Sequence, residues 1–526
     1  MITSGFFLWY SRFTLFSHGS QQQYKSTLCR LFAGCDMSET SSASAKPTKN
    51  FFVEMLTRDI SLEDAILDLL DNCVDGVQRS AEGVDSDQPY SGYWAEISFS
   101  NEGFKIEDNC GGIPIHIARK YAFRLGRPPE MDDEDRNKFT IGTYGIGMKR
   151  AIFKMGMDAT VCAQTKEDSF SVAITSDWMK DEDDWTLPLE ETGRSLDIEG
   201  TQITIRQLRP GIEEMCREGN KSKLHSAIIG QIRYQYSYIL SKGFAVRVNG
   251  YSVTPAPLEL KWGSPVNTSF AIEPYLYEAT IDEVEINLAV GFYRPTPTQE
   301  EIDAETIVDR AEANRLRRGS KDIAGWTIIC NDRVVVYADR TLLTGWGGDG
   351  LPKYHPQFIS IAGIVHFRCE DAKKLPVNTT KRGIDASSLI YLYVKSNFMT
   401  KGLKIFTSYT NKWKGYTQEE HEISDNTPVL VPQKIAAQIP KENWKDVRRR
   451  FSSSEKKDIE QSQRQFVPTR LPEPKRDQAD SKVRISYSKE IDEVELVADY
   501  LLGECEVKPS KVGEVCFDHI LGKAKR

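Results

Sequence analysis

The sequence lacks the features that mark several large classes of protein. Its 526 residues contain ten cysteines, and none forms a CxxC pair, which argues against a disulfide framework or a zinc site. Cys516 and His519 have ligand-like spacing, but they have no second pair of ligands, so we do not expect a metal there. No apolar run approaches the roughly 20 residues that cross a bilayer. We therefore expect reduced thiols, a cytoplasmic protein and no membrane segment.

Excess charge is also small. The net charge is −8 at pH 7, so the chain as a whole does not attract nucleic acid or acidic membranes, although a local basic patch is compatible with this balance. A hydrophobic fraction of 40% and a charged fraction of 27% are those of an ordinary globular protein. The length predicts two or three domains.

Acidic residues are missing from the start of the chain. Residues 1–36 are aromatic and mildly basic, with no acid before Asp36. This segment is either an organellar presequence or precedes the true start at Met37, and we favour the second interpretation. The residues after Met37 are polar and rich in serine, which is typical of disorder. Residues 1–50 are therefore predicted to be a disordered leader or a wrongly assigned start.

Hydrophobic periodicity divides the rest of the chain. Residues 51–242 are predicted to form a first α/β domain, which ends with a long helix over 224–243. Strand-like segments continue through a second α/β domain at 243–410. Residues 411–482 are rich in Gln, Ser, Pro and both charges, as in a linker. Residues 483–526 contain a helical pattern and are predicted to be a small C-terminal module.

A helix predicted over residues 61–80 carries the first motif. Asp68, Asn72 and Asp75 lie at positions i, i+4 and i+7, so they share one helical face opposite an apolar stripe. Carboxylate and amide oxygens on such a face suit a magnesium ion and an activated water. The alternative is the solvated acidic face of an ordinary amphipathic helix.

Two glycine-containing motifs follow. Asp108 ends a predicted strand and is followed by Gly111 and Gly112, which let the backbone pass close to a flat ligand. Asp108 can then accept a hydrogen bond from an exocyclic amine; the alternative is a plain turn. The second motif opens a helix with Gly142, Gly145, Gly147 and Lys149, whose backbone N–H groups and ammonium can cradle phosphates. It matches neither the P-loop nor the Rossmann pattern. A Gly-Thr pair containing Thr201 opens a later strand.

The order and spacing of these four motifs resemble the GHKL ATPases, the superfamily of gyrase B, MutL, the ninety-kilodalton heat-shock chaperones, sensor histidine kinases and MORC proteins. The resemblance covers about residues 54–206. It implies an α+β fold with a Bergerat-type α/β sandwich that binds ATP and Mg²⁺. It also implies that residues between Pro114 and Gly142 form a lid over the nucleotide. The implied roles are magnesium for Asn72, the adenine amine for Asp108, support of the adenine end for Thr201, and the phosphates for Gly145, Gly147 and Lys149. Asp75, Gly112 and Gly142 complete the implied nucleotide-binding set.

The sequence departs from that family at two positions. Asp68 stands where the family usually has a glutamate base, and it is shorter by one C–C bond, about 1.5 Å. Slow turnover is therefore expected, because loss of good base geometry costs about 10²–10⁴ in rate. Cys110 stands where the family normally has glycine, so either a negative φ or a tolerated strain is expected there.

Residues 243–410 resemble the ribosomal-protein-like α/β transducer domain of gyrase B, MutL and MORC-type members. That domain sends a basic residue to the γ-phosphate. The segment from Lys373 to Gly383, which ends in an Asn-Thr-Thr-Lys-Arg-Gly loop, supplies the candidates, of which Lys381 is preferred over Lys374 and Arg382. This loop and the Asp-Leu-Leu-Asp-Asn motif look most like prokaryotic relatives of MORC proteins.

The resemblance implies an ATP-driven conformational switch or clamp. Two protomers would dock when ATP is bound, giving an ATP-dependent homodimer, and the partner would be DNA or a protein, as in defence against foreign DNA. An alternative of a different class is an interaction scaffold that binds ATP without turning it over. A histidine kinase is disfavoured, because no histidine lies in a plausible dimerisation helix before the ATP domain.

Overall fold

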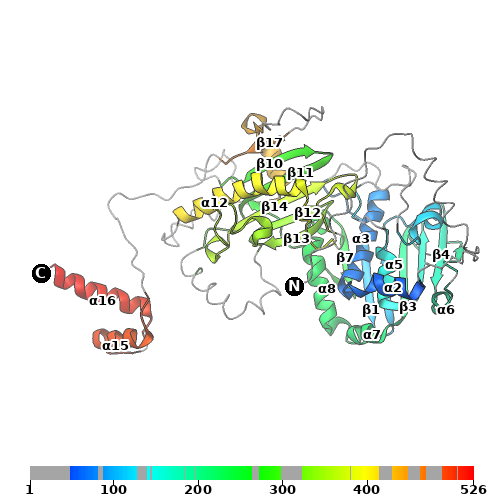
Figure 1. Cartoon of the computed structure of the whole chain (residues 1–526), viewed down its shortest axis with the longest axis horizontal. Helices are drawn as coiled ribbons and strands as arrows, with labels where there is room; N and C mark the ends of the chain where they lie inside the picture. The colour runs from blue at the N-terminus through cyan, green and yellow to red at the C-terminus, as the bar shows by residue number, and fades with distance from the viewer. Residues whose placement is uncertain are drawn as a thin grey trace, which may run out of the picture. The chain divides into compact units, whose positions relative to one another are not determined.

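The computed structural model of the chain (Figure 1) divides it into two compact units, residues 1–55 and residues 56–526. In the first unit only residues 48–55 are described, and they begin helix α2 (Lys49–Arg58). Residues 127–138 of the predicted lid and most of the predicted leader lie outside the described residues. The structure describes residues 48–80, 87–126, 139–141, 145–182, 184–194, 196–262, 272–297, 302, 323–378, 381–413, 429–447, 463–468, 488–505 and 507–525.

The first sheet has eight strands in the order β5-β4-β3-β6-β2-β1-β7-β8. Side chains in β1 and β2 alternate between buried and partly buried, because successive residues of a strand point to opposite faces. One face of the sheet is therefore available for helices to cover. The strands are β1 (Trp94–Ser100), β2 (Gly103–Asp108), β3 (Gly156–Gln164), β4 (Ser169–Ile174), β5 (Leu189–Glu191), β6 (Gly200–Leu208), β7 (Ala245–Val248) and β8 (Tyr251–Ser252).

Helix α3 (Leu62–Ser80) confirms the helix predicted over 61–80. Ser61 begins it: the Ser61 hydroxyl oxygen accepts the Asp64 N–H at 3.1 Å and also contacts the Asp64 carboxylate at 2.9 Å. The α3 stripe of leucine, isoleucine and valine is buried, and α3 packs against α5 (Gly147–Met155), α8 (Lys223–Gln235) and β2. The remaining helices of this part are α4 (Ile115–Ile117), the π-helix Ala118–Ala122, α6 (Ser176–Lys180) and α7 (Pro210–Cys216).

The long helix predicted over 224–243 is interrupted. Helix α8 ends at Gln235, and α9 (Ser237–Ser241) begins after Tyr236, whose φ of −109° and ψ of 13° are not helical. The Tyr236 side chain is fully buried and its hydroxyl oxygen lies 2.9 Å from the Leu67 carbonyl oxygen. Contact of this hydroxyl with α3 gives a physical reason for the break between α8 and α9. Helical periodicity in the sequence did not reveal this break.

The predicted boundary after residue 242 is wrong. Strand β7 pairs in parallel with β1, and β8 pairs with β7, so residues up to Ser252 belong to the first sheet. A parallel pair needs a crossover connection that is usually helical, and α8 and α9 are the helices that come directly before β7.

The second sheet has seven strands in the order β13-β12-β14-β11-β10-β17-β16. Its apolar core includes Trp326, Phe367 and Phe406, and α12 (Thr400–Lys412) lies along it (Figure 1). Its strands are β10 (Tyr275–Ile281), β11 (Val284–Phe292), β12 (Gly325–Cys330), β13 (Arg333–Asp339), β14 (Ile361–Arg368), β16 (Lys445–Asp446) and β17 (Gln463–Phe466); helix α11 (Leu389–Val394) and the π-helix Lys395–Met399 precede α12.

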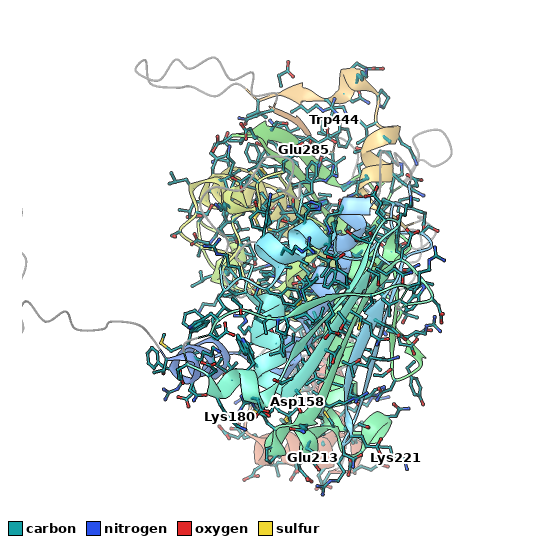
Figure 2. The ribbon with its side chains drawn as sticks, turned by 90° about the vertical axis from the view of Figure 1, so that its right-hand side faces the viewer. Asp158, Lys180, Glu213, Lys221, Glu285 and Trp444 are labelled. Carbon is teal, nitrogen blue, oxygen red and sulfur yellow. The ribbon has the colours of Figure 1, made fainter. Side chains whose placement is uncertain are left out.

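The range predicted as a linker contributes to this second part. Strand β17 pairs with β10, and β15 (Val429–Leu430) pairs with β9 (Leu260–Lys261). Helix α14 (Pro432–Gln438) buries Ile435 completely. Figure 2 labels Trp444 on this added segment and Glu285 on β11. The described parts of residues 411–482 are therefore folded against the second sheet, and the linker prediction fails for them.

The C-terminal module consists of α15 (Ile491–Leu502) and α16 (Pro509–Ala524), which pack against each other and bury Ala498 and Val512. Helix α15 ends at Gly503, whose φ of 72° is the left-handed conformation that favours glycine. Across the described ranges, no helix combines the length and apolarity that a bilayer crossing needs.

Candidate functional site

The acidic residues of α3 are buried, whereas the neighbouring amide is exposed. Asp68, Asp71 and Asp75 have exposed fractions of 6%, 1% and 5%, and Asn72 lies on the exposed side of the helix. The prediction of one open polar face therefore holds for Asn72 alone. Buried carboxylates need partners, and other elements of the fold supply them.

Asp68 lies between two cations and a glycine. Its carboxylate is paired with Arg150 of α5, and its Oδ1 is 3.3 Å from Nζ of Lys381. Gly147 packs on the same carboxyl group, because a Cβ at that position would be 3.3 Å from Asp68 Cγ. The first turn of α5 is thereby held against the acidic part of α3.

Asp71, which was not among the predicted site residues, is the most densely paired acid of α3. Its Oδ2 is 2.8 Å from Lys381 Nζ and its Oδ1 is 3.0 Å from Arg333 Nε, while the Tyr236 hydroxyl donates to Oδ1 at 2.6 Å. Burial alone would raise the pKa of Asp71, but the charges of Lys381 and Arg333 outweigh it and lower that pKa. The sequence feature that could have identified Asp71 is its position beside the apolar stripe of the helix, where a carboxylate is expected to be buried.

Lys381 comes from the second sheet's part of the chain and reaches α3. Burial alone would lower the pKa of Lys381, but the carboxylates of Asp71 and Asp68 outweigh it and raise that pKa. The two alternative donors are engaged elsewhere. Arg382 pairs with Asp64 and donates to Gln231 at 2.9 Å, and Lys374 pairs with Glu283 at 2.7 Å. The geometry thus favours Lys381 among the three candidates.

Asp108 is fixed at the end of β2. Its Oδ1 accepts the N–H of Cys110 at 2.8 Å and the N–H of Thr201 at 3.3 Å. Burial raises the pKa of Asp108, and these two N–H groups offset part of that effect. Thr201, at the start of β6, therefore contacts Asp108 through its backbone N–H.

The glycines after Asp108 are required by the backbone. Gly111 and Gly112 have φ values of 85° and 71°, and a Cβ at Gly112 would lie 2.2 Å from the Gln164 carbonyl oxygen. Cys110 is not among the residues with positive φ. The cysteine is accommodated there because the left-handed positions fall on the next two residues.

The second glycine-rich turn is described in part. Gly142 lies outside the described residues, and Gly145 has a φ of 66°. Lys149 was predicted to face the phosphates, but its ammonium is buried and donates to the carbonyl oxygens of Ala122, at 2.8 Å, and Gly145. A buried ammonium requires such acceptors. Asp75 likewise braces the turn, since its Oδ1 accepts the Ile141 N–H at 2.7 Å.

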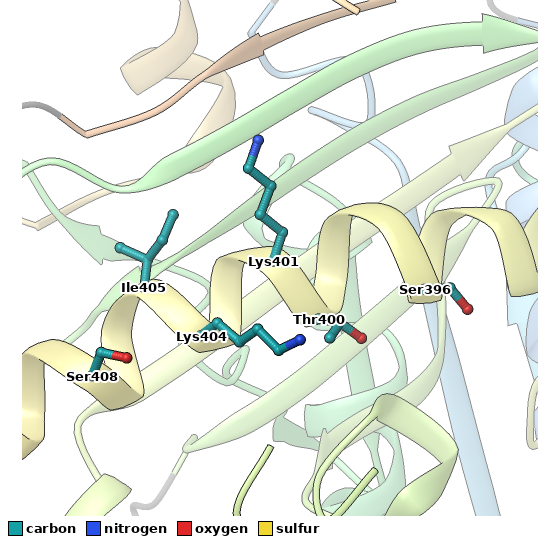
Figure 3. A pocket seen from close by; sticks show the side chains of 6 residues that line it. All are labelled: Ser396, Thr400, Lys401, Lys404, Ile405 and Ser408. Carbon is teal, nitrogen blue, oxygen red and sulfur yellow. The ribbon is translucent and has the colours of Figure 1, made fainter. Parts of the chain in front are cut away.

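A groove along α12 contains none of these residues. It is lined by Ser396, Thr400, Lys401, Lys404, Ile405 and Ser408 (Figure 3). The Nζ atom of Lys401 donates to Gln465 at 2.6 Å. The groove along α12 is therefore separate from the predicted nucleotide site.

Comparison with known proteins gives one family. Residues 60–203 match the model of the histidine kinase-, DNA gyrase B- and HSP90-like ATPases, which is just over a quarter of the chain. The match contains α3, the Asp108 turn, the glycine-rich turn and Thr201, and it supports the GHKL superfamily and an ATP-binding ATPase domain. A search of curated proteins found no match.

Proposed function

We propose that the chain is an ATP-driven conformational switch whose second sheet responds to the nucleotide bound beside α3. The observation that carries this proposal is Lys381, which comes from the second sheet's part of the chain and contacts Asp68 and Asp71. A cation that bridges two parts of a fold through carboxylates can exchange them for a phosphate, and the exchange changes what holds the parts together.

The residues of the site suit a magnesium nucleotide. Asp108 is a buried acceptor for the adenine amine, and the close approach at Gly112 leaves no room for a side chain. The exposed amide of Asn72 supplies an oxygen of the kind that magnesium prefers. Bound magnesium would neutralise charge on the phosphates. Asp75 and Lys149 orient the glycine-rich turn through their bonds to the backbone of Ile141 and Gly145.

Asp68 and Lys381 carry the proposed chemistry. Asp68 accepts the proton of the attacking water once Lys381 has moved from its carboxylate to the γ-phosphate. Because Lys381 would stabilise charge that develops during phosphoryl transfer, its removal lowers kcat more than it lowers nucleotide affinity. We further propose that the chain belongs with the prokaryotic MORC-type ATPases. The other proposed properties are an ATP-dependent homodimer, a DNA or protein partner and a cytoplasmic location.

A scaffold that binds ATP with negligible turnover is a second candidate. It is favoured by the two cations on Asp68, because Arg150 and Lys381 contact its two carboxylate oxygens, which an attacking water would have to reach. In that case ATP binding itself, without hydrolysis, controls partner recruitment.

Steady-state phosphate release, measured beside ATP affinity, separates the two candidates. The switch predicts release that saturates with ATP and disappears in Asp68→Asn while ATP still binds. The scaffold predicts ATP affinity with release no greater than that of Asp68→Asn. Absence of ATP binding by the folded wild-type chain would refute both.

A further inference from the structure

The turn between β12 and β13 is polar, yet Asn331 is buried and Asp332 is partly buried. Asn331 and Asp332 form a two-residue hairpin turn, with φ values of 42° and 67°, which asparagine and aspartate tolerate better than most residues. Only 3% of Asn331 is exposed. Turn residues usually face solvent. Polar side chains that are buried in a turn instead need hydrogen-bond partners within the protein.

The Asn331 carboxamide makes a fixed set of three hydrogen bonds. Its Oδ1 accepts the Cys369 N–H at 2.9 Å, and its Nδ2 donates to the Cys369 carbonyl oxygen at 2.9 Å. Because one bond needs an acceptor and the other a donor, these two hydrogen bonds to Cys369 fix the orientation of the carboxamide. The same Nδ2 then donates to the Thr140 carbonyl oxygen at 3.1 Å. Asn331 therefore ties the second sheet to the chain that leads into the glycine-rich turn.

The residues on either side of Thr140 are held as well. The Phe139 N–H donates to the Glu370 carbonyl oxygen at 3.2 Å, and the Arg368 guanidinium lies 4.2 Å from the centre of the Phe139 ring. The Ile141 N–H donates to Asp75 of α3 at 2.7 Å. Three consecutive residues thus connect the second sheet to an acid of the proposed nucleotide pocket.

Asp332 makes a second connection from the same turn. Its carboxylate accepts from the Tyr90 hydroxyl at 2.7 Å, and Gln78 of α3 donates to that hydroxyl at 2.8 Å. His366 of β14 lies 3.1 Å from the other carboxylate oxygen. The turn is therefore joined to α3 by two routes, through Tyr90 and through Thr140.

We propose that Asn331 is a positioning residue, which couples the placement of the second sheet to the glycine-rich turn through Thr140, Ile141 and Asp75. This inference rests on the proposed ATPase function. Asn331 acts at a distance from the nucleotide, because its partners are backbone groups at Thr140 and Cys369. Its contribution is the relative placement of Lys381 and the phosphate-binding turn, which matters for turnover more than for binding.

The test compares Asn331→Gly with Asp282→Gly. Glycine keeps the positive φ while removing the amide, and Asp282 occupies an exposed turn of the same sheet with a φ of 50°. For Asn331→Gly we expect kcat for ATP hydrolysis to fall about fivefold or more, with KM and ADP affinity within about twofold of wild type. Asp282→Gly should leave all three unchanged. Asn331→Asp keeps the acceptor but not the donor, so it should behave like Asn331→Gly.

Amide hydrogen exchange of residues 139–141 provides a readout independent of turnover. The Phe139 and Ile141 amides should exchange about fivefold faster or more in Asn331→Gly and as in wild type in Asp282→Gly. Wild-type kcat together with wild-type exchange in Asn331→Gly would overturn the proposal. An equal loss of kcat in Asn331→Gly and Asp282→Gly would also overturn it. If the wild type neither binds nor hydrolyses ATP, the proposed function fails, and exchange alone then decides whether Asn331 holds this segment.

Discussion

Removal of the Asp71 charge should destabilise the protein strongly. In Asp71→Asn, Lys381 keeps Asp68 at 3.3 Å, but Arg333 loses its paired carboxylate while only 3% of its side chain is exposed. Removal of one partner of a buried ion pair costs about 3–5 kcal/mol. Because Lys381 retains Asp68 as a partner, we expect a loss at the lower end of this range, about 3 kcal/mol of unfolding free energy.

Urea unfolding followed by tryptophan fluorescence measures this effect. Asp177→Asn is the control, since Asp177 forms an exposed ion pair with Lys180, and no measurable change is expected there. The pKa of Asp71 is lowered in the folded protein. Its stabilisation is therefore present above the usual aspartate range and is lost as pH falls through the folded pKa. The penalty should shrink over the same acid range, and a penalty below about 1 kcal/mol near neutral pH would refute the reasoning.

Three further predictions concern the proposed chemistry. Asp68→Asn should bind ATP but lose phosphate release, whereas Asp68→Glu should retain or raise it; wild-type turnover in Asp68→Asn would place the base elsewhere. Lys381→Ala should lower kcat by about tenfold or more and leave ADP affinity unchanged by calorimetry, with a much larger effect on kcat than Lys374→Ala or Arg382→Ala. Burial raises the pKa of Asp108, so ATP affinity in a descending pH series should weaken before an ordinary aspartate titrates. Asp108→Asn should remove that dependence, and an identical pH profile in this variant would contradict the assignment.

Local periodicity predicted the elements around the site. The apolar stripe of α3 and the strand that ends at Asp108 depend on residues that are close in sequence, and the structure confirms both. The structure places the Thr201 backbone nitrogen 3.3 Å from Asp108 Oδ1, and the resemblance assigned both residues to the adenine end. Lys381 was expected to reach the γ-phosphate, which stays a prediction, and its contact with Asp71 was not expected.

Long-range pairing was not predictable in the same way. Strand β7 joins the first sheet through its pairing with β1, which is about 150 residues earlier in the chain. Strand β17 looks like a linker because its sequence is polar. However, the Gln463 side chain accepts from the hydroxyls of Tyr277, at 3.2 Å, and Tyr393, at 3.0 Å. Such tertiary hydrogen bonds let a polar segment be buried, and composition alone does not reveal them.

The buried ionic cluster shows the same limit. The positions of Asp68 and Asp75 on α3 suggested an open acidic face, yet both carboxylates are buried and paired. Their partners include Arg150 and Lys381, which are distant in sequence. The spacing on one helix specifies which side chains share a face, but not what covers that face.

Calorimetric titration with ATP, in the presence and absence of magnesium, tests the central claim most directly. The wild-type chain should bind ATP more tightly when magnesium is present. Asn72→Ala should lose that magnesium-dependent binding while keeping the wild-type unfolding midpoint, because Asn72 is exposed on α3. Magnesium-dependent affinity that is unchanged in Asn72→Ala would contradict the assignment of the nucleotide pocket to α3.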